Sequence, residues 1–71
     1  MDFQISLEAA RVNAKLTQEE AAAEMAVSRN TILNWESGKS EPTITQARRL
    51  AILYGLPLES IIFVPSKSNN I

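Results

Sequence analysis

Residues that begin and end helices recur at short intervals along this chain, which limits it to a set of short helices. Thr17 stands three positions before Glu20, the spacing of a capping box in which each side chain binds the other residue's backbone N–H. Ser28 can cap a further helix. Gly38 and Gly55 stand where a helix favours a left-handed terminating residue. Apolar residues recur three and four positions apart without clean alternation, so we predict an all-α protein without strands.

These signals predict five helices and an apolar core. The helices span about residues 3–14, 18–25, 29–37, 44–54 and 56–63. Either Asp2 or Ser6 can cap the first of them. Cysteine is absent, so the core of this 71-residue chain must rest on apolar burial alone. The residues expected in that core are Met25, Val27, Ile32, Trp35, Leu50 and Leu53.

A chain of this length forms one domain, which we place at residues 1–64. Residues 65–71 have too little apolar content to order themselves, and we expect them to form a disordered tail. The longest apolar run, residues 61–64, is far too short to span a membrane, and the first residues lack a signal-peptide pattern. The expectation is a cytoplasmic protein without membrane contacts.

The residue types present argue against enzyme chemistry. The sequence has no histidine, no cysteine and no glycine-rich phosphate loop, so the usual bases, nucleophiles and metal ligands are missing. We therefore expect no catalysis, no metal, no cofactor and no small-molecule ligand. The net charge of −1 lacks the basic excess usual in nucleic-acid binders. Any DNA binding must depend on a local concentration of positive charge.

The predicted third helix has two chemically different faces. At about 100° per residue, Ile32 and Trp35 fall on one face. The opposite face carries Arg29, Asn30, Leu33, Asn34 and Ser37. Arginine can bridge the two major-groove acceptors of guanine, and asparagine can pair with adenine, although the same residues are also ordinary surface residues. Two helices joined by so short a link predict a helix-turn-helix whose second helix enters the major groove.

The order of these motifs resembles a known family. Leu16-Thr17-Gln18-Glu19-Glu20 is followed by Ser28-Arg29-Asn30-Thr31-Ile32, Trp35-Glu36-Ser37-Gly38 and Glu41-Pro42. Together they are similar to the Cro/C1-type, lambda-repressor-like helix-turn-helix regulators of phages and bacteria, over about residues 3–63. The resemblance implies a compact five-helix fold with the helix-turn-helix in helices 2 and 3. It also implies operator binding, commonly as a homodimer, and a phage or prophage origin.

The resemblance implies roles for individual residues. Bases in double-stranded DNA would be read by Ser28, Arg29, Asn30 and Asn34, with Thr31 assisting. The DNA backbone would be contacted by Gln18, Ser37 and Lys39, although Gln18 can equally support a helix cap and Lys39 can simply be solvated. Arg11 and Glu36 align with a structural ion pair that ties the first helix to the end of the third.

Three positions depart from the family pattern. Ala26 stands where glycine is usual in the turn, so a left-handed backbone there carries modest strain. Ala21 is smaller than the usual leucine. The connector after the third helix contains Glu41 and only one basic residue, Lys39. The last departure predicts modest affinity for DNA.

A protein-binding function is the alternative. Small phage-encoded relatives of such repressors can engage a partner repressor in place of an operator. The acidic balance favours that option, as do the apolar residues Leu33, Ile61, Ile62, Phe63 and Val64, which exceed what one short helix can bury. The run at residues 61–64 can equally close a homodimer.

Overall fold

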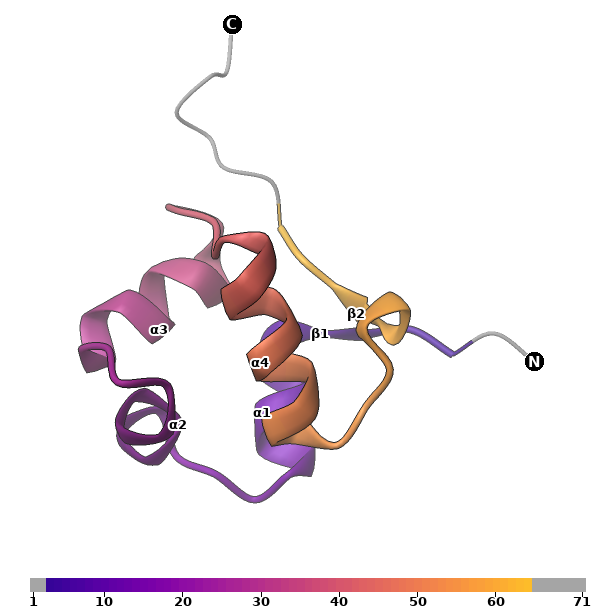
Figure 1. Ribbon diagram of the computed structural model, residues 1–71, viewed down its shortest axis with the longest axis horizontal. Coiled ribbons are helices and arrows are strands. Elements are labelled where there is room, and N and C mark those ends of the chain that lie inside the picture. The colour runs from indigo at the N-terminus through magenta and orange to yellow at the C-terminus, as the bar shows by residue number, and fades with distance from the viewer. Residues whose placement is uncertain (1–2, 65–71) are drawn as a thin grey trace, which may run out of the picture.

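The computed structural model describes residues 3–64, in which four α-helices surround one apolar core (Figure 1). The helices are α1 (Leu7–Asn13), α2 (Gln18–Met25), α3 (Arg29–Ser37) and α4 (Ile44–Tyr54). The predicted helical fold class is thus confirmed. The expected disordered tail at residues 65–71 lies outside the described residues, as do residues 1–2. No helix within residues 3–64 has the length and apolar character needed to cross a membrane.

The predicted fifth helix is wrong. A single 3₁₀ turn, Leu58–Ser60, follows α4 and leads into the strand β2 (Ile61–Ile62). Pro57 precedes the turn with extended backbone and gives it no side-chain cap. The two isoleucines that follow are β-branched, which favours extended backbone over helix.

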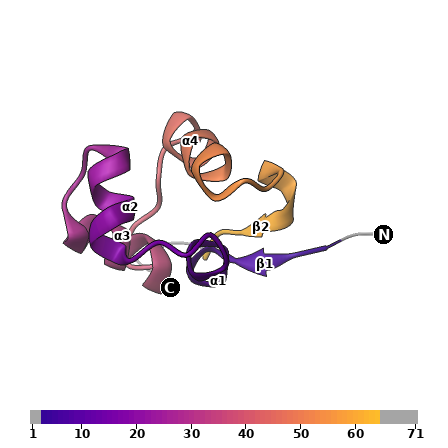
Figure 2. The same ribbon diagram turned by 90° about the horizontal axis from the view of Figure 1, so that it is seen from below.

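The prediction that the chain has no strand is also wrong. Ser6 is the cap of α1, because its Oγ accepts the Ala9 N–H at 3.0 Å, so α1 begins at Leu7 and not near residue 3. The preceding residues form the strand β1 (Ile5–Ser6), which pairs in parallel with β2. Strands of two residues are too short to show an alternating pattern. The pair lies at the opposite end of the molecule from α2 and α3 (Figure 2).

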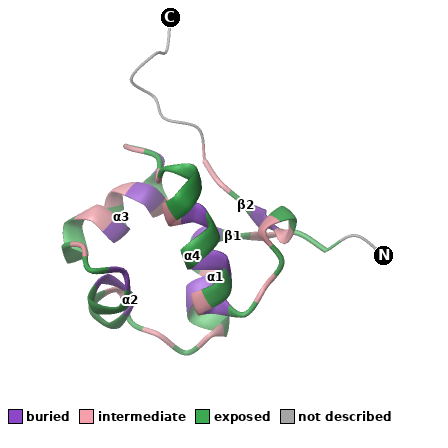
Figure 3. Cartoon of the chain, viewed as in Figure 1, coloured by how far each residue is buried: buried purple, intermediate pink, exposed green. Residues whose placement is uncertain are grey.

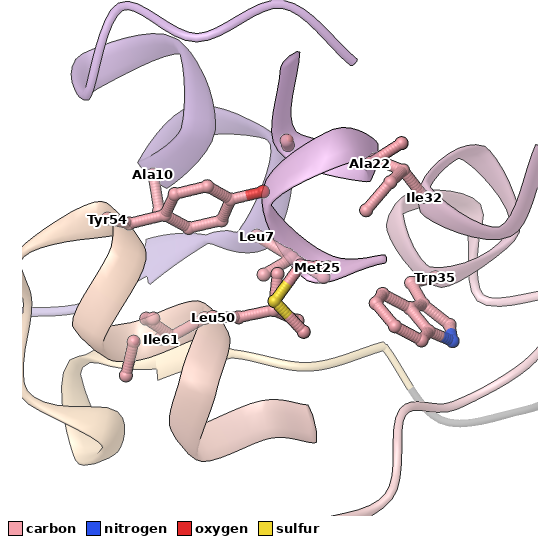
Figure 4. Close-up of a cluster of buried hydrophobic side chains, with 11 residues drawn as sticks. Leu7, Ala10, Ala22, Met25, Ile32, Trp35, Leu50, Tyr54 and Ile61 are labelled. Atoms are coloured by element: carbon pink, nitrogen blue, oxygen red, sulfur yellow. The ribbon is translucent and has the colours of Figure 1, made fainter. Parts of the chain in front are cut away.

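The core lies between the inward faces of the four helices, where buried residues gather (Figure 3). Trp35 of α3 and Tyr54 of α4 lie at opposite ends of the cluster, with Met25 and Leu50 between them (Figure 4). Four of the expected core residues are buried: Met25, Ile32, Trp35 and Leu50. Val27 and Leu53 are partly buried against the cluster. Ala21 is fully buried, so α2 presents a largely small-residue face to the core.

Ile61 also belongs to this core, which corrects part of the expected partner surface. It is only 6% exposed and packs with the buried cluster. Within the run at residues 61–64, Ile62 is exposed, and Phe63 and Val64 are partly buried. Burial of Ile61 in the core therefore accounts for part of the apolar run at residues 61–64.

Each of the four α-helices is followed within two residues by a left-handed residue, which allows a sharp change of direction. These residues are Lys15, Ala26, Gly38 and Gly55. At the end of α2, Ala26 has φ 59° and ψ 42°, and the N–H of Val27 donates to the carbonyl of Ala22 at 3.0 Å. The left-handed backbone expected at Ala26 is confirmed. A side chain at such a position is strained because Cβ approaches the following carbonyl oxygen.

We predict that Ala26→Gly stabilises the protein by about 1 kcal/mol, because glycine relieves the left-handed strain. Ala23→Gly is the matched control, since Ala23 is exposed inside α2 and the same change there should destabilise by about 1 kcal/mol. Urea denaturation measures both. Equal destabilisation by the two changes would show that the turn at Ala26 carries no strain.

Candidate nucleic-acid interface

The helix-turn-helix is formed by two helices whose starts are fixed by side-chain caps. Thr17 and Glu20 form the predicted capping box at α2, with reciprocal hydrogen bonds of 2.9 and 3.0 Å. Ser28 caps α3, because its Oγ accepts the N–H of Thr31 at 3.1 Å. Only residues 26–28 separate the two helices. This short, capped link fixes the position of α3 relative to α2.

The two faces of α3 are separated as the sequence indicated. Ile32 and Trp35 are buried in the core. Arg29, Asn30 and Ser37 are exposed, Asn34 is partly buried, and Leu33 is 40% exposed. Within residues 3–64, no segment covers the face that carries these side chains.

Several of the polar groups on this face are held by local hydrogen bonds. The hydroxyls of Ser28 and Thr31 lie 3.0 Å apart and bond to each other. Ser37 donates its hydroxyl to the carbonyl of Asn34, and the backbone N–H of Lys39 donates to the same carbonyl at 2.9 Å. The Lys39 residue itself is exposed just beyond the helix. These two hydrogen bonds fix the conformation of the chain where α3 ends and the connector begins.

A buried ion pair joins α1 to α3 behind this face. Arg11 Nε of α1 donates to Glu36 Oε2 of α3 at 2.6 Å, and the two side chains are 10% and 5% exposed. Arg11 Nη1 also donates to the carbonyl of Leu16 at 2.9 Å. The hydrogen bond to Glu36 is the main cause that raises the pKa of the Arg11 guanidinium above its ordinary value. The guanidinium therefore remains charged.

Gln18, at the start of α2, is tied to the same ion pair. Its Nε2 donates to Glu36 Oε1 at 3.1 Å. An amide nitrogen carries two N–H groups, so one donor remains for another acceptor. Gln18 lines a shallow hollow of about 130 Å³ together with Leu33 and Ser37, which places the start of α2 beside the exposed face of α3.

Glu19 is a residue of this region that the sequence analysis missed. Its Oε2 lies 3.0 Å from Arg29 Nε, with side-chain exposures of 68% and 54%. The pair connects the first turn of α2 to the first turn of α3. The sequence offered only a weak signal, because glutamate early in a helix is common wherever the helix dipole favours a negative charge.

Tyr54 is a second residue that was not anticipated. It is buried, and among residues 3–64 its hydroxyl has no hydrogen-bond partner. Burial is the main cause that raises its pKa to about 12, and the negative charge of Glu36 acts in the same direction. The hydroxyl is therefore protonated under ordinary conditions, close enough to the buried ion pair to respond to its charges.

This tyrosine, the only one in the chain, should make the protein sensitive to alkali. Because the pKa is about 12 in the folded state against an ordinary 10.0, stability is unaffected below pH 10 and falls between pH 10 and 12. We predict a loss of about 2 kcal/mol over that interval. Urea denaturation at several pH values measures the loss, which should be absent in Tyr54→Phe. Tyrosinate absorbance appearing near pH 10 in the folded protein would contradict it.

The capped α2–α3 pair, with the exposed polar face of α3, defines the chain as a helix-turn-helix domain. A model of the helix-turn-helix family matches residues 7–61, which is most of the chain. The chain belongs to the Cro/C1-type helix-turn-helix family, whose members are DNA-binding transcriptional regulators and not enzymes.

Curated relatives share this domain. The HTH-type transcriptional activator BcrR of Enterococcus faecalis is 31% identical over 62 residues, covering 87% of this chain and 30% of BcrR. The cryptic phage CTXphi transcriptional repressor RstR of Vibrio cholerae is 36% identical over 52 residues, covering 73% of this chain and 47% of RstR. An uncharacterized HTH-type transcriptional regulator of Methanocaldococcus jannaschii is 41% identical over 46 residues, covering 65% of this chain and 70% of that protein. The chain thus spans less than half the length of the first two.

Proposed function

We propose that this chain recognises a specific operator in double-stranded DNA and acts as a small transcriptional regulator, a repressor or a Cro-like switch protein. The observation that carries the proposal is the face of α3 opposite Ile32 and Trp35, which is uncovered and carries Arg29, Asn30 and Asn34. A helix presented in this way fits the major groove of B-DNA. The named activities of BcrR and RstR support regulation of transcription in either direction.

The proposed base contacts lie in the first two turns of α3. Arg29 would bridge O6 and N7 of a guanine, while Asn30 and Asn34 would each pair with an adenine. Ser28 and Thr31 share one hydrogen bond between their hydroxyls, which leaves lone pairs for contacts at the edge of the groove. Each good bidentate contact would contribute about 1–3 kcal/mol of discrimination.

The proposed phosphate contacts flank the base contacts. Gln18 has a free amide N–H and lies at the positive end of the α2 dipole, which favours an anion. Ser37 and Lys39 would bind the backbone beyond the other end of α3. These groups set the register of the protein on DNA and carry no sequence information themselves.

A pair of copies related by two-fold symmetry would double this small surface. Ile62 is 46% exposed, and Phe63 and Val64 are partly buried beside a hollow of about 290 Å³ that includes Ile44 and Ala47. We propose that these three apolar residues, without the buried Ile61, close a homodimer. A symmetric dimer would bind two half-sites one helical turn apart.

Selection from random double-stranded DNA tests the proposal. We expect enrichment of one sequence, and a dimer would enrich a palindrome whose half-site centres lie about 10 base pairs apart. Arg29→Ala and Asn34→Ala should each weaken binding to that sequence by about 1–3 kcal/mol and relax discrimination at one base pair. Lys39→Ala should weaken binding to all sequences alike and reduce the slope of affinity against salt by about one.

The thermal transition provides the control, because these three residues are exposed or partly buried. It should be nearly unchanged in all three variants. If binding and the thermal transition were lost together, the positions would be structural. If no DNA sequence were enriched, operator recognition by this chain would be excluded.

One observation supports the second candidate function, a protein-binding modulator that engages a partner repressor. Leu33 is an apolar side chain in the middle of the exposed face of α3, beside a shallow hollow. Such a residue can meet a thymine methyl group or an apolar residue of a protein.

Replacement of Leu33 by glutamine separates the two functions. If a repressor encoded next to this gene is the partner, Leu33→Gln should abolish co-purification of the two proteins. Ile52→Gln is the matched control, because Ile52 is an exposed apolar residue on α4. Unchanged co-purification in both variants would remove Leu33 from the partner surface.

A further inference from the structure

Arg29 is not a free side chain on the exposed face of α3, because Glu19 binds it from α2. The contact joins Glu19 Oε2 to Arg29 Nε at 3.0 Å. The carboxylate therefore lies beside the inner nitrogen of the guanidinium. A guanidinium has five N–H donors in a fixed plane, so the four on the two terminal nitrogens remain available.

The position of the carboxylate determines which contacts Arg29 can make. Guanine is read by two parallel N–H groups directed at O6 and N7, a geometry that the two terminal nitrogens supply end-on. An ion pair at Nε favours orientations of the guanidinium that keep Nε beside the carboxylate and the terminal nitrogens away from it. Without that partner, the long side chain is free to bind a phosphate group on either strand, where no sequence information lies.

Glu19 also changes the electrostatic balance of the surface. Arg29 and Lys39 are the exposed basic residues at the two ends of α3, and Glu19 offsets the charge of one of them. The next residue, Glu20, has a different role, because its carboxylate accepts the Thr17 N–H in the capping box. A carboxylate beside the DNA backbone repels phosphates whatever the base sequence.

We propose that Glu19 is a specificity-determining residue, which orients Arg29 toward a guanine and withholds it from the phosphate backbone. This inference rests on the proposed operator recognition. Glu19 would act through Arg29 and make no base contact, so it is a positioning residue. The acidic side chain reduces affinity for DNA in general and increases the ratio of specific to non-specific binding.

The test compares Glu19→Gln with Glu20→Gln. Both changes remove one negative charge from the first turn of α2, and glutamine at position 20 can still accept the capping hydrogen bond. Affinities are measured for the sequence selected by the unaltered protein, for the same sequence with each guanine replaced in turn, and for random duplex DNA. Each titration is repeated at several salt concentrations and in an Arg29→Ala background.

For Glu19→Gln we expect discrimination at one guanine to fall by about tenfold. Binding to random DNA should become tighter, and the salt slope should steepen by about one, because Arg29 gains a phosphate contact. Glu20→Gln should leave discrimination at that guanine unchanged. In the Arg29→Ala background, Glu19→Gln should have no further effect on discrimination, since the two residues act as a unit.

Two results would overturn the inference while leaving operator recognition intact. One is unchanged guanine discrimination in Glu19→Gln, and the other is an equal loss in the presence and absence of the Arg29 side chain. If the unaltered protein selects no sequence at all, operator recognition fails and the inference fails with it. The random-DNA titrations distinguish this case, because they report electrostatic binding independently of selection.

Discussion

The buried pair of Arg11 and Glu36 is the interaction on which the arrangement of the helices depends. It joins α1 to α3, and through Leu16 and Gln18 it also fixes the segment that leads into α2. Removal of one member of such a pair leaves a buried charge without compensation, which costs about 3–5 kcal/mol. A domain of this size is stable by roughly 4–10 kcal/mol in total. One polar contact therefore contributes to both the fold and the position of the exposed face.

The same pair links the core to the proposed DNA surface. Glu36 accepts hydrogen bonds both from Arg11 of α1 and from Gln18 of α2. Tyr54 reaches toward these charges from α4 with a hydroxyl that has no partner among the described residues. Two of the residues that α2 buries, Ala21 and Ala22, are small, which limits the apolar contact of this helix with the core. The hydrogen bonds from Gln18 to Glu36 and from Arg11 to the Leu16 carbonyl add to the contacts that hold α2 in place.

Features that depend on residues close together in the sequence were predicted well, and most contacts between residues far apart in the sequence were not. The starts of α2 and α3 were predicted correctly because Thr17, Glu20 and Ser28 act on backbone groups within three residues. Arg11 and Glu36 were named from the family resemblance, and the structure brings them into contact. The strands and the burial of Ile61 were missed because they depend on Ile5, at the other end of the described chain. Glu19 was passed over for the same reason, since its partner lies on another helix.

The parallel pairing of β1 and β2 gives the domain an almost circular path. Ile5 and Ile61 are adjacent in space, at the end of the molecule opposite α2 and α3 (Figures 1 and 2). Because the strands are parallel, the chain enters the pair at the end of the molecule away from α2 and α3 and leaves it in the opposite direction. Phe63 and Val64 therefore lie beside Pro42 and Ile44, where the connector after α3 leads into α4. A module attached before residue 3 would therefore stay clear of α3, whereas one attached after residue 64 would begin beside the connector that follows α3.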